Sequence, residues 1–232
     1  MIDWTLNPDY ATGEAVCPFS DIDRVFALDG ELITHDSLSR VLRVSIDGKR
    51  YYVKRYTGSG KNRTRRWFGL RRWLGPPRVR AEWQNLLTFR AWGIPTATVV
   101  AYGLERRCGA FTRGAVVTEE IPDTMDLAQM NYRNDPRLSD RRWVAEVSRQ
   151  IADIARTLHA ARFAHNDLKW RNLLVDGRST VYLIEDVYKR QEVDVEQFAQ
   201  GTVPHQPVPC RQFRAGPPHS PDVIAGARYR AT

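Results

Sequence analysis

The stretch 165–175, HNDLKWRNLLV, places four polar side chains at fixed offsets directly before an apolar run. The four are His165, Asp167, Lys169 and Asn172. On a loop, a carboxylate can accept the proton of an attacking hydroxyl, an amide oxygen can hold Mg²⁺, and an ammonium can neutralise a phosphoryl group in transfer. The pattern therefore indicates a loop that carries out phosphoryl transfer.

The segments on either side of this loop predict a helix and a short hairpin. Residues 139–161 carry apolar side chains at helical spacing, and Ser139 at their start can cap the helix. The stripe consists of Trp143, Val147, Ile151, Ile154 and Leu158. Residues 173–175 and 181–184 favour two strands joined around an Asp-Gly pair. We therefore expect the loop to lie between a long helix and a hairpin.

Earlier in the chain, residues 40–56 predict a hairpin around Asp47-Gly48, a pair that suits a two-residue primed turn. In this register Val41 faces Lys54. Side chains alternate along a strand, so Tyr52 lies on the same face as Lys54. Leu42, Val44, Tyr51 and Val53 share the opposite face.

The rest of the first half predicts one helix and two more strands. Residues 78–92 carry an apolar stripe, with Glu82 beside it, and Gly93 ends the helix. Residues 98–104 and 111–121 are predicted strands, and the second leads into Glu-Glu-Ile-Pro. The order is a β-rich half with one helix, followed by a helical half with a small hairpin.

Composition restricts the class of protein. The chain has 232 residues, of which 42% are hydrophobic, so it can form a packed core. We find no signal-peptide pattern and no apolar run of about 18 residues that could span a membrane. Three separated cysteines favour neither a disulfide framework nor a zinc site. We therefore expect a cytoplasmic protein, with no metal beyond the Mg²⁺ that the loop 165–175 suggests.

The net charge of +8 comes from one segment. Residues 61–80 hold eight Lys and Arg and no acid, and without them 27 basic residues balance 27 acidic ones. Cations alternate with aromatic rings here, in Arg65, Arg66, Trp67, Arg71, Arg72 and Trp73. Such a segment suits an anionic membrane surface, where rings lie at headgroup level and Arg binds lipid phosphate. A solvated loop is the alternative, and nucleic acid is not expected because no nucleic-acid fold pattern accompanies the segment.

The pattern HxDLKxxN resembles the catalytic loop of the protein-kinase-like superfamily. The resemblance implies that Lys54 is the strand lysine that binds the α and β phosphates of ATP, and that Glu82 is its helix partner. It also implies that Asp167 takes the acceptor proton, Lys169 stabilises the transferred phosphoryl group, and His165 supports the loop. Asn172 and Glu185 would bind Mg²⁺. The implied fold is α+β with two lobes that meet near residue 121.

The nucleotide-binding side departs from the superfamily pattern. No GxGxxG lies between residues 20 and 45, so we expect the loop HDSLSR to cover the phosphates with backbone N–H groups and the Ser37 and Ser39 hydroxyls. Val41 and Tyr52 are candidates for the adenine wall. Residues Glu119, Glu120 and Ile121 would contact adenine through their backbone.

Several short sequence segments around Lys54 resemble those of the bacterial lipopolysaccharide core kinases, which phosphorylate heptose and Kdo in the inner core. These segments are DGKRYYVKRYTGSG, RAEW, GIPT, VVAYG and TEEI. The resemblance implies an ATP-dependent kinase that acts on a core precursor at the cytoplasmic face of the inner membrane. Several core kinases have a catalytic loop of the HRDC type, whereas DLKWRN is closer to the motif of protein kinases. A serine/threonine protein kinase is therefore the first alternative. A non-catalytic nucleotide-binding or membrane-adaptor protein is the second.

The sequence from residue 186 onward has a different character. Residues 186–191, DVYKRQ, match the translation of a transposase mosaic-end adaptor used in sequencing libraries. An aspartate codon interrupted by that adaptor would be completed as glutamate, so we interpret Glu185 as a replaced metal-binding Asp. The alternative is a native chain whose metal acid is Glu185 or Asp186. We expect three parts: an N-lobe (1–121) with the insert 58–80, a truncated C-lobe (122–185), and a non-native or disordered tail (186–232).

Overall fold

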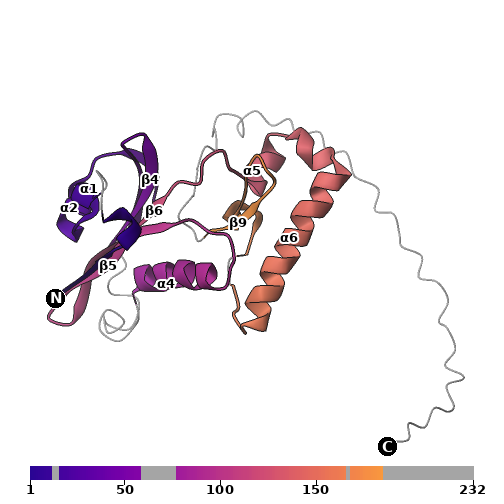
Figure 1. Cartoon of the computed structure of the whole chain (residues 1–232). Helices are drawn as coiled ribbons and strands as arrows, with labels where there is room; N and C mark the ends of the chain where they lie inside the picture. Colours follow the sequence, from indigo (N-terminus) through magenta and orange to yellow (C-terminus); the bar gives the residue numbers. More distant parts are fainter. Residues whose placement is uncertain (12–15, 59–76, 166–167, 185–232) are drawn as a thin grey trace, which may run out of the picture. The chain divides into compact units, whose positions relative to one another are not determined.

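The larger of two sheets forms the first half of the protein. The structure is a computed structural model that describes residues 1–11, 16–58, 77–165 and 168–184 (Figure 1). Six antiparallel strands lie in the order β1-β5-β6-β4-β3-β2. They are β1 (Ile2–Leu6), β2 (Glu31–His35), β3 (Ser39–Ile46), β4 (Lys49–Thr57), β5 (Val99–Arg107) and β6 (Ala110–Glu119). Strand β4, which carries Lys54, therefore lies inside the sheet between β3 and β6.

The β3–β4 hairpin has the predicted register. Asp47 and Gly48 both have positive φ, at 48° and 71°, as a primed two-residue turn requires. Val41 pairs with Lys54 and Ile46 with Lys49. The alternation of side chains predicted from the sequence is confirmed by this register, which puts Tyr52 and Lys54 on one face of the sheet.

Each face of this sheet packs against helices. Phe19 at the end of α1 (Val16–Phe19) and Val25 of α2 (Ile22–Ala27) share a buried cluster with inward residues of β3, β4, β5 and β6. On the other face, α4 (Arg78–Ala91) packs on β5 and β6 through a cluster that contains Val79, Trp83 and Leu86. Helix α4 confirms the predicted helix within one residue at its end. The sequence analysis did not predict β1, β2 or the two short helices.

The second half contains the long helix and a small sheet. A two-residue strand, β7 (Met125–Asp126), precedes α5 (Leu127–Tyr132), whose first turn is capped by Asp126. Two short 3₁₀ segments, Pro136–Ser139 and η4 (Trp170–Asn172), flank α6 (Arg141–Ala160) in the chain. The order of the small antiparallel sheet is β7-β8-β9, with β8 (Leu173–Val175) and β9 (Val181–Leu183) forming the predicted hairpin.

The start of α6 corrects one detail of the sequence analysis. Ser139 ends the preceding 3₁₀ turn, and the side chain of Asp140 accepts the hydrogen bond from Arg142 N at 2.9 Å. A carboxylate accepts this bond as well as a hydroxyl does, and it also opposes the positive end of the helix dipole. The helix therefore begins two residues later than predicted. Its predicted stripe faces the core, with Val147, Ile154 and Leu158 buried.

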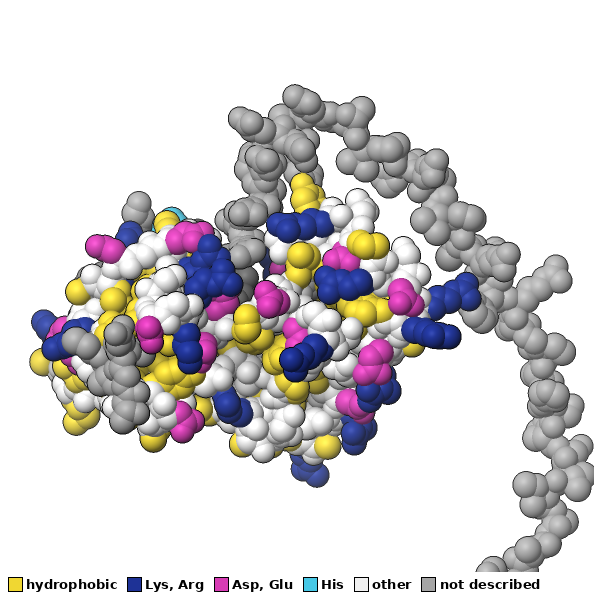
Figure 2. All heavy atoms as spheres, turned by 45° about the horizontal axis from the view of Figure 1, so that its top comes forward, with side chains coloured by type: hydrophobic (Ala, Val, Ile, Leu, Met, Phe, Trp, Pro, Cys, Tyr) yellow, Lys and Arg dark blue, Asp and Glu magenta, His cyan; other side chains and the backbone are white. Residues whose placement is uncertain are grey.

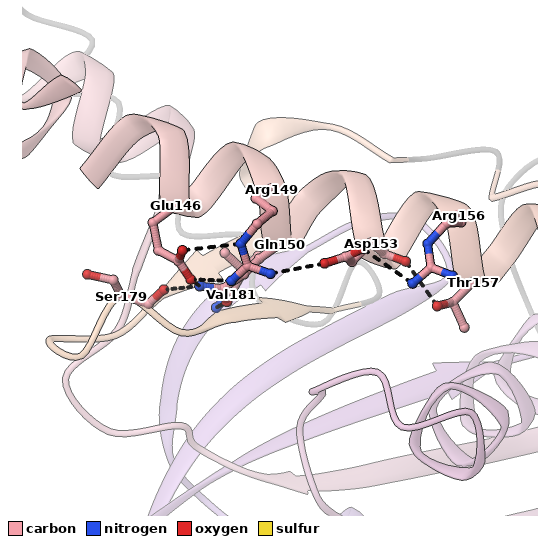
Figure 3. Close-up of polar contacts among 8 residues, drawn as sticks. All are labelled: Glu146, Arg149, Gln150, Asp153, Arg156, Thr157, Ser179 and Val181. Carbon is pink, nitrogen blue, oxygen red and sulfur yellow. Dashed lines mark hydrogen bonds and ion pairs between the residues drawn. The ribbon is translucent and has the colours of Figure 1, made fainter. Parts of the chain in front are cut away.

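Helix α6 holds the β8–β9 hairpin by hydrogen bonds as well as by apolar packing (Figure 3). Gln150 donates to Ser179 O at 2.9 Å and accepts from Val181 N at 2.9 Å. Its amide therefore pairs with the backbone where β9 begins, much as a neighbouring strand would. Around it, exposed ion pairs join Glu146, Arg149 and Asp153 along the helix.

The charged side chains on the described surface are of mixed sign. On the face drawn in Figure 2, Lys and Arg lie beside Asp and Glu over the described part of the chain. This agrees with the balance of charge outside residues 61–80. Among the helices of the described residues, none is both long and apolar enough to cross a membrane.

Candidate active site

A buried ion pair joins the large sheet to helix α4. Lys54 Nζ of β4 lies 3.0 Å from Glu82 Oε1 and 3.0 Å from Glu82 Oε2 of α4. The two side chains are only 8% and 7% exposed. Burial of two charges is costly unless they are well paired, and contact with both carboxylate oxygens meets that condition. The structure thus brings together the lysine and the glutamate that the sequence analysis selected.

Tyr56 is a third member of this group, and the sequence analysis missed it. Its hydroxyl donates a hydrogen bond to Glu82 Oε2. Its ring centroid lies 5.3 Å from Lys54 Nζ, within the range of a cation–π contact. Burial, together with the adjacent charge of Glu82, raises the pKa of the Tyr56 hydroxyl far above its usual range. The hydroxyl is therefore a neutral donor, directed at the carboxylate that holds Lys54.

The sheet face that carries Lys54 also carries the predicted adenine-wall residues. Val41 and Tyr52 are buried and pack together with Ile33. Thr118 pairs with Tyr52 across β4 and β6 and is fully buried, yet its Oγ1 has no hydrogen-bond partner in the described part of the chain. A buried hydroxyl without a partner is costly and is usually explained by a ligand or a water. Thr118 is thus a second candidate site residue that the sequence analysis missed.

The segment after β6 is fixed by its charged side chains. Glu119 accepts a hydrogen bond from the Tyr10 hydroxyl and lies 3.6 Å from Lys49 Nζ, and Glu120 Oε2 lies 3.0 Å from Arg50 Nε. The Tyr10–Glu119 contact joins the N-terminal segment to the end of β6.

The hydrogen bonds of the backbone N–H groups in this segment bear on the predicted contacts with adenine. The N–H groups of Glu119 and Glu120 donate to Thr98 O and Arg50 O, at 2.9 and 2.8 Å. Pro122 has no N–H, so Ile121 is the N–H donor of this segment that remains for a base. The N–H groups of Glu119 and Glu120 are engaged within the protein, and the backbone contacts of Glu119, Glu120 and Ile121 with adenine stay a prediction.

The loop between β2 and β3 does not support the expected use of its N–H groups. Asp36 Oδ1 accepts from Leu38 N at 2.6 Å and from Ser39 N at 2.7 Å. The Ser39 hydroxyl donates to Asp36 Oδ2 at 3.1 Å. The acceptor of these hydrogen bonds is thus the Asp36 carboxylate of the loop itself. The sequence analysis expected a phosphate of the nucleotide to be the acceptor.

The catalytic-loop sequence is described at both of its ends. The ring of His165 stacks on Phe89, with centroids 5.6 Å apart. Lys169 is exposed, whereas Asn172 is 2% exposed. Asn172 O accepts a hydrogen bond from Ile184 N at 2.9 Å, and Ile184 immediately precedes Glu185 in the sequence.

Several predicted site residues lie outside the described residues. They are Asp167, Glu185 and the basic-aromatic group Arg65, Arg66, Trp67, Arg71, Arg72 and Trp73. The six residues of the basic group belong to the predicted membrane-binding segment, and the two acids to the predicted catalytic centre. Their assigned roles stay predictions.

Helix α4 connects the ion pair with the catalytic loop. Glu82 and Phe89 are seven residues apart, so they lie two turns apart on one side of the helix. Glu82 contacts Lys54, and Phe89 contacts His165 and Phe163. One rigid element therefore fixes both the strand lysine and the first residue of the loop.

Comparison with known proteins identifies the family of the chain. A model of the family described as lipopolysaccharide kinase (Kdo/WaaP) matches residues 25–200. The chain belongs to this family. A structure titled WaaP in complex with acyl carrier protein has a TM-score of 0.55 and 24% identity, covering 79% of this chain and 70% of that chain. The α+β, two-lobed protein-kinase-like fold predicted from the sequence is thereby confirmed.

Two curated members of the Kdo/WaaP family are similar in sequence. The lipopolysaccharide core heptose(I) kinase WaaP of Pseudomonas aeruginosa is 30% identical over 159 residues, which is 65% of this chain and 54% of the relative. The enzyme of the same name from Escherichia coli is 28% identical over 155 residues, which is 65% of this chain and 55% of the relative. The chain thus spans about half the length of the curated relatives that it matches, and these relatives are kinases.

A kinase family implies the use of ATP, typically with Mg²⁺, and the chemistry of the described residues fits both groups. One sheet face carries the buried Lys54 ammonium and the Thr118 hydroxyl, which has no partner among the described residues, and this suits a nucleotide. Asn172 provides an amide oxygen at a buried position next to the strand that precedes the acid at 185. Amide and carboxylate oxygens are ligands that Mg²⁺ prefers.

Proposed function

We propose that this protein transfers the γ-phosphoryl group of ATP to a sugar hydroxyl of the lipopolysaccharide inner core. The buried Lys54–Glu82 pair carries the proposal, because a lysine held by a helix glutamate is the arrangement that kinases use to bind the α and β phosphates. Membership of the Kdo/WaaP family supports the sugar acceptor. The named relatives act on core heptose, and that acceptor is proposed here for this chain.

Each site residue has a proposed part in the reaction. Lys54 binds the α and β phosphates, while Ile121 and the Thr118 hydroxyl bind the base beside Val41 and Tyr52. Asp167 orients the acceptor hydroxyl and takes its proton, and Lys169 stabilises the transferred group. Asn172 and the acid at position 185 hold Mg²⁺, which neutralises charge on the phosphates.

The basic-aromatic segment would place the protein at its acceptor. We propose that residues 61–80 bind the anionic cytoplasmic face of the inner membrane, where a core precursor is exposed. Sedimentation with anionic and with zwitterionic liposomes tests this role. Salt-sensitive binding to the anionic vesicles is expected, and equal or absent binding to both would remove the membrane role.

The test of function is transfer of labelled phosphate from Mg-ATP to phosphate-stripped core lipopolysaccharide, with a generic protein acceptor in the same reaction. The protein with Glu185 is compared with the Glu185→Asp variant, since the shorter acid restores the residue expected at the metal site. Label on the glycolipid, stronger with the aspartate variant, is the expected result. Label on protein alone would favour a serine/threonine protein kinase, the alternative function that the DLKWRN motif supports.

A further inference from the structure

Tyr56 contacts both partners of the ion pair that is proposed to bind ATP. Lys54 and Tyr56 are two residues apart on β4 and lie on the same face of the sheet. The Tyr56 hydroxyl donates to Glu82 Oε2, and Lys54 Nζ lies over the ring, 5.3 Å from its centroid. At 6% exposure, Tyr56 is as well buried as the pair itself.

Packing alone does not explain the hydroxyl. The ring of Tyr56 belongs to the cluster that joins α4 to the sheet, together with Val79, Trp83 and Val116. A phenylalanine would fill that space equally well and would avoid the burial of a polar group. The hydroxyl instead forms a charge-assisted hydrogen bond, which is stronger than a neutral one and depends on direction. Its effect is to restrict where the Glu82 carboxylate can point.

We propose that Tyr56 is a positioning residue for nucleotide binding, and this proposal rests on the role of Lys54 given above. The hydroxyl fixes one oxygen of Glu82, and the carboxylate in turn holds the Lys54 ammonium where the phosphates bind. The ring of Tyr56 contacts the ammonium directly, through the cation–π contact at 5.3 Å. The site is thereby organised before ATP binds, so less binding free energy is spent on ordering it.

The test is the affinity of the full chain for Mg-ATP, measured by calorimetry for the wild type and for Tyr56→Phe. The variant keeps the ring and loses only the hydroxyl, so we expect an affinity about tenfold weaker, the scale of one hydrogen bond to a charged group. Tyr51→Phe is the matched control, because Tyr51 is buried in the same strand on the opposite face. It should bind Mg-ATP as the wild type does.

A double-mutant cycle with Glu82→Ala separates positioning from general damage. If Tyr56 acts through Glu82, its hydroxyl has nothing to position in the Glu82→Ala chain, and Tyr56→Phe should change the affinity there by less than about twofold. An equal loss in both backgrounds, or wild-type affinity in Tyr56→Phe, would overturn the inference. A wild-type chain that does not bind Mg-ATP would instead overturn the proposed function and the inference with it. Circular dichroism shows that each variant is folded at the temperature of the titration.

Discussion

Phe89 stacks on His165 at 5.6 Å between ring centroids, and the same helix carries the Glu82 carboxylate that binds Lys54. Phe89 is fully buried, in a cluster that also contains residues of α6, β8 and β9. Helix α4 is thus a shared support of the ion pair and of the segment that leads into the catalytic-loop sequence. A substitution that disturbs one end of α4 should therefore also disturb the contacts at its other end.

Removal of the Phe89 ring tests how α4 is packed. Phe89→Ala should lower the free energy of unfolding by about 3–5 kcal/mol, since it leaves a cavity at a buried aromatic position. Leu87→Ala is the control, because Leu87 lies on the same helix and is 39% exposed, and it should change stability by less than about 0.5–1 kcal/mol. Chemical denaturation of both variants measures the difference. Equal effects would show that α4 does not pack as described.

The ion pair predicts different outcomes for stability and for turnover. Lys54→Met leaves the Glu82 charge buried without its cation, so stability should fall by about 3–5 kcal/mol. A second change, Glu82→Gln, removes that charge and should restore part of the stability. Turnover should remain reduced by about 100-fold or more in both variants, because the charge proposed to bind the phosphates of ATP is absent. Near-normal turnover in either variant would refute the role of Lys54.

How far the sequence predicts this structure depends on the length and regularity of each element. The Asp-Gly turn set the register of β3 and β4, and long apolar stripes located α4 and α6. The helices α1 and α2 have four and six residues, too few for a periodic pattern, and Pro18 lies inside the first. Their burial against the sheet, which the sequence alone does not show, forms them.

The two missed site residues differ in how they could have been found. Alternation along β4 already puts Tyr56 on the face of Lys54, so the pattern that selected Tyr52 could have selected Tyr56 as well. Thr118 could not have been found in this way. Its place opposite Tyr52 depends on the pairing of β4 with β6, two strands that are not joined by a hairpin. Non-local register of this kind requires the folded structure.

Thr118 predicts opposite effects on stability and on binding. Thr118→Val keeps the shape and removes a buried hydroxyl that has no partner in the described part of the chain, so the free energy of unfolding should rise by about 1 kcal/mol. Affinity for Mg-ATP should fall several-fold if the hydroxyl binds the base. Thr112→Val in the same strand is the matched control, since the Oγ1 of Thr112 is also buried without a partner in the described residues. It should gain stability without loss of affinity, and the same loss in both variants would exclude a specific role for Thr118.

Asp135 predicts how stability depends on acid pH. Hydrogen bonds from Arg137 lower the pKa of this carboxyl to about 2, through contacts of 2.9 Å from Nε and 2.7 Å from Nη2. A carboxyl with a lowered folded-state pKa stabilises the fold above its unfolded pKa of about 4 and loses that contribution as the pH falls towards about 2. Asp135→Asn should therefore be less stable at neutral pH, by up to about 1 kcal/mol for a partly exposed pair. The difference should vanish near pH 2 in denaturation series, and a constant difference would show that the charge is not its source.

A substitution of Asp167 should lower turnover without changing the affinity for Mg-ATP. Asp167→Asn keeps the size of the side chain and removes the group proposed to take the acceptor proton, so turnover should fall by about 10²–10⁴-fold. Affinity for Mg-ATP should stay within about twofold, because the residues proposed to bind the nucleotide, Lys54 and Thr118, are unchanged. Asp153→Asn on the exposed side of α6 is the control for loss of one acidic side chain, and it should keep full turnover. Wild-type turnover in Asp167→Asn would remove the proposed base, whereas loss of nucleotide binding with turnover would assign Asp167 to the binding of ATP.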